Sequence, residues 1–149
     1  SGVMADATAF RLVVDGLARL AAAQADRIDL VVGIEARGFP YGAALAHHLG
    51  AGFVTARKPG KLPGSVHARA YELEYGTATL ELHRDAMAGG HGVVIVDDVL
   101  ATGGTAAACA DLVRRTGAQL EAALFVLRIP ELGGAEVMDA AGVPWSCLL

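Results

Sequence analysis

The stretch Val93–Thr105 constrains the fold of this chain more than any other part of it. It begins with four β-branched apolar residues, Val93–Val96, which are typical of a strand buried on both faces in a parallel sheet flanked by helices. The acids Asp97 and Asp98 follow, and a loop of small residues then leads into an alanine-rich segment that predicts a helix. A strand, a tight loop and a helix in direct succession indicate an α/β fold.

The loop Ala101–Thr105 has the chemistry of a phosphate site, whereas the acids before it do not. Backbone N–H groups at the start of a helix, with the hydroxyls of Thr102 and Thr105, suit phosphate oxygens. The carboxylates of Asp97 and Asp98 would repel a phosphate and suit sugar hydroxyls or a hydrated Mg²⁺. The combination predicts a bound sugar phosphate. A simpler alternative is a packing turn, in which the glycines only allow a tight connection and the acids are solvated.

The rest of the chain alternates between helix and strand patterns. Apolar residues spaced along Phe10–Ala21 predict an amphipathic helix, and Ile28–Ile34 reads as a strand. A helix with small residues then runs to His48, and Gly52–Lys58 is the next strand. Further strands are expected at Thr77–His83, Leu120–Ile129 and Trp145–Leu149, with helices at Ala106–Gly117 and Ala135–Ala141. This order predicts one three-layer domain over residues 1–149, with a central, mainly parallel twisted sheet between helices.

A basic segment leaves the end of one of these strands. Arg57, Lys58 and Lys61 place three cations within five residues, at the start of a Gly- and Pro-rich stretch, Pro59–Ala70, that reads as a mobile loop. Such a run of charge is usually a solvated face. Here the loop leaves a strand end, so it is also suited to close over an anionic ligand and exclude water.

A second polar turn, Glu35–Gly38, follows the strand that ends at Ile34. It offers backbone donors, a helix start and the Arg37 guanidinium beside an acid, which suits a pyrophosphate and its metal ion. The alternative is a surface turn in which Glu35 and Arg37 pair with each other. Because ligands of open α/β sheets bind beyond the carboxyl ends of the strands, the turn, the basic segment and the phosphate loop are expected to converge.

Composition narrows the possible partners. The net charge of −4 provides no broad basic face for nucleic acid or an anionic membrane, and no apolar run is long enough to span a bilayer. The hydrophobic fraction of 54% exceeds the soluble average and predicts a homodimer that buries apolar surface. Cys109 and Cys147 form no Cys-x-x-Cys pattern, so the chain is expected to be cytoplasmic, with Cys109 a structural thiol.

The stretch Val93–Thr105 resembles the motif with which type I phosphoribosyltransferases bind 5-phosphoribosyl pyrophosphate (PRPP). Within that family, the turn at 33–39, the Arg-Lys-Pro-Gly-Lys segment at 57–61 and the Leu-Glu-Tyr-Gly segment at 73–76 resemble the adenine phosphoribosyltransferases in order and spacing. The resemblance extends from about Phe10 to the end of the chain. It implies transfer of the 5-phosphoribosyl group from PRPP to adenine, giving AMP and pyrophosphate, with Mg²⁺ as cofactor.

The resemblance also assigns roles to residues. It implies that Glu74 exchanges a proton with the purine and that Tyr75 helps to close the site, a catalytic pair that composition and spacing alone would not single out. The ribose, its 5-phosphate and, through water, the Mg²⁺ ion would be held by Asp97, Asp98, Ala101, Thr102, Gly103, Gly104 and Thr105. The pyrophosphate would be held by Glu35, Ala36, Arg37, Gly38, Arg57, Lys58 and Lys61.

One feature of the family is not visible in this sequence. Adenine enzymes usually carry a Pro-Gly-x-x-Phe segment before the first helix, as part of a hood over the base, and Ser1–Thr8 contains nothing of that kind. The hood is therefore expected to be missing here, and base specificity has no contacting residue to support it. Two alternatives remain: transfer to another purine such as xanthine, and a regulator that binds PRPP without catalysis.

Overall fold

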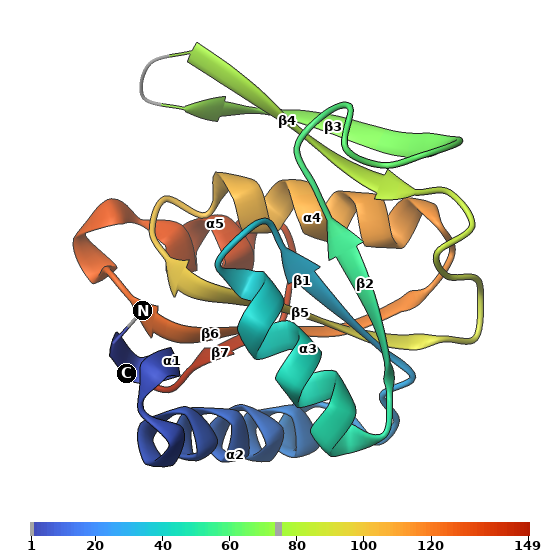
Figure 1. The fold of residues 1–149 in the computed structure, drawn as a ribbon. Helices are drawn as coiled ribbons and strands as arrows, with labels where there is room; N and C mark the ends of the chain where they lie inside the picture. Colours follow the sequence, from blue (N-terminus) through green and yellow to red (C-terminus); the bar gives the residue numbers. More distant parts are fainter. Residues whose placement is uncertain (1, 74–75) are drawn as a thin grey trace.

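Five parallel strands form the centre of the computed structural model, which describes residues 2–73 and 76–149. Their order in the sheet is β2 (Gly52–Ala56), β1 (Leu30–Ile34), β5 (Gly92–Leu100), β6 (Gln119–Arg128) and β7 (Trp145–Cys147), as Figure 1 shows. After β1 the chain forms the edge strand β2, and it later returns to the sheet on the other side of β1 as β5. The carboxyl ends of β1 and β5 therefore flank the switch point, where ligands of such sheets bind.

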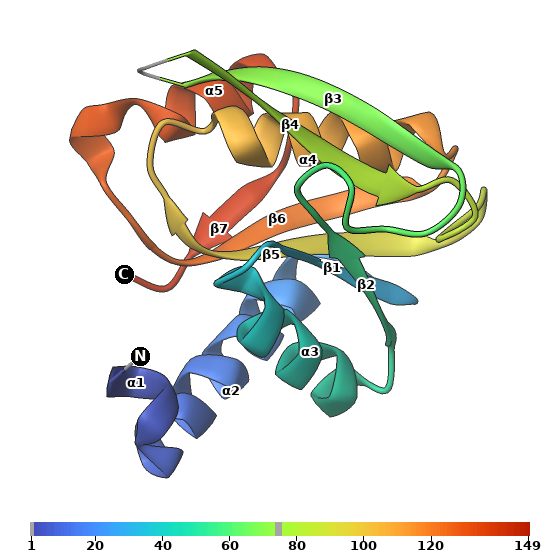
Figure 2. The same ribbon diagram turned by 45° about the horizontal axis from the view of Figure 1, so that its top comes forward.

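Helices cover both faces of the sheet, which gives the three layers that the sequence predicts. On one face lie α2 (Ala7–Gln24) and α3 (Gly38–Leu49), with α1 (Gly2–Ala5) before them; on the other lie α4 (Gly104–Arg115) and α5 (Gly134–Ala140), as Figure 2 shows. Val94 and Val96 pack toward α2 and α3, whereas Val93 and Ile95 pack toward α4. All four are fully buried, because alternate strand residues point to opposite faces and both faces are covered.

A two-stranded antiparallel hairpin lies outside the sheet. Its strands are β3 (Val66–Leu73) and β4 (Gly76–His83), and it packs over α4 (Figure 1). Leu80 and Leu82 of β4 are buried in the same core cluster as Ile95 and Phe125. A β-bridge between Arg57 and Glu81 connects the end of β2 to this hairpin.

Several boundaries differ from the sequence prediction, and three of these differences lie in the loop of the basic segment, the central strand and the first long helix. The expected loop 59–70 ends early, because β3 starts at Val66 and pairs with His83 at the base of the hairpin. The central strand continues to Leu100 and includes Asp97 and Asp98, since β6 pairs with it that far. The first long helix starts at Ala7, where Asp6 accepts a hydrogen bond from the N–H of Ala9 at 3.0 Å and caps it. The short η1 turn (Pro130–Leu132) was not predicted.

Candidate active site

The phosphate loop, residues 101–105, joins the end of β5 to the start of α4. Gly103 precedes the helix with φ of +88°, a conformation that suits glycine, and its carbonyl accepts a hydrogen bond from the N–H of Ala107 at 2.9 Å. Among the described residues, no side chain caps this helix end, so its first N–H groups are available to a ligand. A pocket of about 70 Å³ lies here, lined by Asp97, Val99, Leu100, Ala101, Thr102, Gly103, Thr105 and Ala106.

Gly134, a glycine that the sequence did not point to, supports this loop from behind. A Cβ on Gly103 would lie 2.9 Å from the Cβ of Val137 and 3.1 Å from the Cα of Gly134. A Cβ on Gly134 would lie 2.5 Å from the carbonyl oxygen of Ala101. The loop and the start of α5 are therefore in backbone contact. The Gly133-Gly134 pair before a short helix is the sequence signal that could have indicated this.

The two acids at the end of β5 have different surroundings. Asp97 accepts the N–H of Asp98 at 2.8 Å, and Asp98 accepts the N–H of Val99 at 2.8 Å. Burial raises the pKa of Asp97 to about 8, and the neighbouring Asp98 carboxylate adds to this effect. Asp98 instead lies 3.6 Å from a guanidinium nitrogen of Arg37, at a pocket of about 410 Å³ that Met4 and Tyr41 also line.

The turn after β1 reaches the same place. Gly38 lies so close to β5 that a Cβ on it would be 2.6 Å from the carbonyl oxygen of Val96 and 3.3 Å from Oδ1 of Asp97. The peptide bond between Glu35 and Ala36 is cis. Arg37 has a side chain that is 81% exposed and points its charge toward Asp98 rather than Glu35. The simple self-paired turn that the sequence allowed is therefore wrong.

Glu35 contacts the basic segment instead. Its Oε1 accepts a hydrogen bond from Nε of Arg57 at 3.3 Å and from the N–H of Lys58 at 2.9 Å, and its Oε2 pairs with Nζ of Lys61 at 3.4 Å. The parallel pairing of Ile34 with Ala56 brings the next residues of the two strands together. The structure thus unites the turn at 35–38, the basic segment and the strand-end acids, as the sequence predicts.

The chemistry of the acids suits a magnesium ion. Asp97 and Asp98 each use Oδ1 on a backbone N–H, which leaves Oδ2 of Asp97 for a ligand or its water shell, whereas Oδ2 of Asp98 lies 3.6 Å from Arg37 and would share a ligand with that guanidinium. The part of the chain that the structure describes contains no group of three or more His, Cys, Asp or Glu side chains placed to hold a metal ion. A closed protein cage is therefore not found there, and Mg²⁺ usually keeps waters and takes substrate oxygens as ligands.

Comparison with known proteins identifies this arrangement. Residues 5–139 match the family described as the phosphoribosyl transferase domain. The adenine phosphoribosyltransferase of Paracoccus denitrificans is 54% identical over 140 residues, which cover 94% of this chain and 74% of that protein. The chain belongs to the adenine phosphoribosyltransferase family.

Solved structures of the family have the same fold. The adenine phosphoribosyltransferase of Thermoanaerobacter pseudethanolicus superposes with a TM-score of 0.89 at 46% identity, covering 98% of this chain and 83% of that one. The enzyme of Saccharomyces cerevisiae, in complex with an imino-altritol bisphosphate and adenine, gives 0.91 at 39% identity, covering 99% and 83%. The resemblance drawn from motifs is confirmed for family and fold.

Two residues of the predicted adenine phosphoribosyltransferase site are not placed by these observations. Glu74 and Tyr75, the expected catalytic pair, lie outside the described residues. They connect the end of β3 to the start of β4 along the chain. Their assigned roles stay predictions.

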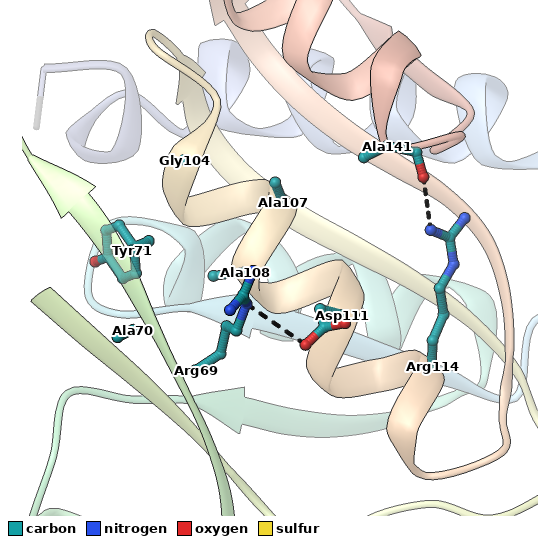
Figure 3. A pocket seen from close by; sticks show the side chains of 9 residues that line it. All are labelled: Arg69, Ala70, Tyr71, Gly104, Ala107, Ala108, Asp111, Arg114 and Ala141. Atoms are coloured by element: carbon teal, nitrogen blue, oxygen red, sulfur yellow. Dashed lines mark hydrogen bonds and ion pairs between the residues drawn. The ribbon is translucent and has the colours of Figure 1, made fainter.

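A larger pocket, of about 650 Å³, lies between β3 and α4 (Figure 3). Its charged groups already have partners: Arg69 pairs with Asp111 at 3.6 Å, and Arg114 donates to the carbonyl oxygens of Ala141 and Gly142 at 2.8 Å each. Of the phosphate-loop residues it contains only Gly104. The two smaller pockets, which adjoin Asp97 and Asp98, therefore fit the family's chemistry better than this larger one.

No described helix combines the length and apolar character that a membrane span requires.

Proposed function

We propose that this chain transfers the 5-phosphoribosyl group of PRPP to N9 of adenine, with AMP and pyrophosphate as products. The observation that carries the proposal is the convergence of three segments, at the ends of β1, β2 and β5, on one edge of the sheet. Each offers what one part of PRPP needs. Two relatives that are 54% and 53% identical to this chain, over 94% and 95% of its length, are named adenine phosphoribosyltransferase.

The phosphate loop binds the 5-phosphate in this proposal. Ala101, Thr102, Gly103, Gly104 and Thr105 supply backbone N–H groups, two hydroxyls and the positive end of α4. Asp97 and Asp98 hold the ribose hydroxyls and, through water, a Mg²⁺ ion. The ion, when bound, neutralises charge on the pyrophosphate as it leaves.

The pyrophosphate lies against the turn and the basic segment. Ala36 and Gly38 supply backbone donors there, and Arg37, Arg57, Lys58 and Lys61 supply the cations. The bond from C1′ to the pyrophosphate oxygen breaks, the bond from C1′ to N9 forms, and N9 loses its proton. Glu74 is assigned to that proton and Tyr75 to closing the site. Water exclusion matters because water would otherwise attack C1′ in place of N9 in the ribosyl-cation-like transition state, and PRPP would be hydrolysed.

The test is an assay with PRPP, Mg²⁺ and radiolabelled adenine, followed by competition with unlabelled xanthine and hypoxanthine. We expect labelled AMP, with neither competitor reducing its formation at equal concentration. Absence of AMP from folded protein would overturn the proposal. If the chain converts xanthine in preference to adenine, the phosphoribosyl transfer stands and the accepted base is xanthine. The homodimer, the single domain and the cytoplasmic location stay predictions from composition, length and cysteine spacing.

A further inference from the structure

Glu35 stands apart from the other residues assigned to the pyrophosphate. Its side chain is only 8% exposed, whereas those of Arg37 and Lys61 are 81% and 50% exposed. Its backbone N–H donates to the carbonyl oxygen of Ala56 at 2.9 Å, so the residue continues the pairing of β1 with β2. A carboxylate this buried, and of the same charge as the ligand, is poorly suited to touch a pyrophosphate.

The carboxylate is nevertheless ionised. Burial opposes ionisation, but the N–H of Lys58, the Arg57 guanidinium and the Lys61 ammonium together outweigh it and lower the pKa of Glu35. All three donors come from residues 57–61. Both carboxylate oxygens are therefore used in holding one basic segment.

That segment is also held from its other side. The guanidinium of Arg57 lies 5.4 Å from the centroid of the Phe39 ring. The backbones of Arg57 and Glu81 exchange hydrogen bonds of 2.9 and 2.7 Å, and Oε1 of Glu81 accepts the N–H of Gly60 at 2.9 Å. Glu81 thus anchors the backbone of the segment together with the Lys58 contact of Glu35, whereas the charged ends of Arg57 and Lys61 both pair with Glu35.

We propose that Glu35 is a positioning residue, which orients Arg57 and Lys61 to receive the pyrophosphate of PRPP and does not itself contact the ligand. The inference rests on the proposed function for the identity of that ligand. Arginine and lysine side chains lose much rotamer freedom when they bind, and a carboxylate that orders them beforehand reduces that cost.

The experiment compares Glu35→Gln and Glu35→Asp with a matched control, Asp29→Asn. Asp29 also accepts a backbone N–H, that of Gly92 at 2.7 Å, and the Nε of an arginine, Arg27 at 3.0 Å, but it precedes β1 at the opposite end of the sheet. Pyrophosphate affinity is measured by calorimetry with Mg²⁺ present, the KM values for PRPP and adenine by steady-state kinetics, and folding by circular dichroism.

We expect Glu35→Gln to weaken pyrophosphate binding and raise the KM for PRPP about tenfold, with the KM for adenine unchanged. Glu35→Asp should recover part of the loss, and Asp29→Asn should show none. In addition, Lys61→Gln should weaken pyrophosphate binding less in the Glu35→Gln background than in the Asp29→Asn background, because Lys61 is already disordered in the former.

Two results would overturn the inference. Unchanged or tighter pyrophosphate binding by Glu35→Gln would mean that Glu35 competes with the ligand for the cations. Equal changes in both KM values, with a fall in melting temperature matched by Asp29→Asn, would mean a role in folding alone. The calorimetry does not depend on turnover. If the unsubstituted chain makes no AMP and Glu35→Gln still weakens pyrophosphate binding, the proposed function fails while the positioning role stands.

Discussion

The two halves of the proposed site are built in opposite ways. The phosphate half is one contiguous segment, residues 101–105, whose donors belong largely to the backbone and whose shape depends on Gly103 and Gly134. The pyrophosphate half takes its charge from side chains on separate segments, and Glu35 connects the turn to the basic segment. A site built from backbone donors should therefore lose all of its contacts to the ligand together when its conformation is lost. A side-chain site should lose function in steps.

The largest effect is expected from Gly103→Ala in the phosphate half. The new Cβ would meet Val137 and Gly134, and the φ of +88° is strained for alanine at a cost of about 1–3 kcal/mol. Loss of several aligned donors should reduce kcat/KM by about 10²-fold or more. The control is Gly90→Ala, with φ of +89° and nothing within 4 Å of the new Cβ. It carries the same backbone strain and should keep full kcat/KM; comparable losses in both variants would refute the backbone argument.

Asp98→Asn comes next and tests the junction between the halves. The amide oxygen can still accept the N–H of Val99, but the charge that faces Arg37, and that would attract a magnesium ion in the proposed function, is lost. Turnover should fall by about 10²-fold, with an unchanged circular dichroism spectrum. Asp111→Asn removes another ion-paired aspartate, one on α4 that pairs with Arg115 at 2.9 Å, and should leave turnover near normal. Unchanged kinetics for Asp98→Asn would remove this residue from the site.

Lys61→Gln should have a smaller effect, as expected for a half built from separate side chains. Its ammonium is half exposed and contributes one charge among several. The KM for PRPP should rise by about three- to tenfold, and the increase should shrink at high salt because exposed charges are screened. A loss as large as that of Gly103→Ala would show that the pyrophosphate half also fails as a unit.

The smallest effect concerns acid stability. The pKa of Glu35 is lowered in the folded protein, so its stabilising contribution is present above its unfolded pKa and is lost as pH falls through the folded value. The melting temperature of Glu35→Gln should lie below that of the unsubstituted chain at pH 7, and the two should converge as pH falls below 4.5, the ordinary value for this carboxyl. A constant difference between pH 7 and pH 3 would contradict an ionised Glu35.

Prediction from the sequence worked best where neighbours along the chain are also neighbours in space. Val93–Val96 and the glycines after them encode a buried strand and a turn by local rules, and both are confirmed. The early start of β3 at Val66 was missed, because its polar residues are stabilised by pairing with β4 rather than by an apolar pattern of their own. The partners of Glu35 were missed for a related reason: they depend on the register between β1 and β2.

By itself, the sequence determined the parallel α/β architecture, the family, and the strand, glycine turn and helix start at residues 93–105, because strand burial, glycine conformation and helix-end donors are local properties of the backbone. Only the tertiary structure decided that Arg37 faces Asp98, that Glu35 contacts Arg57 and Lys61, and that Gly134 supports Gly103. These contacts join residues far apart in the chain, and strand order and register, which no single segment encodes, bring them within reach.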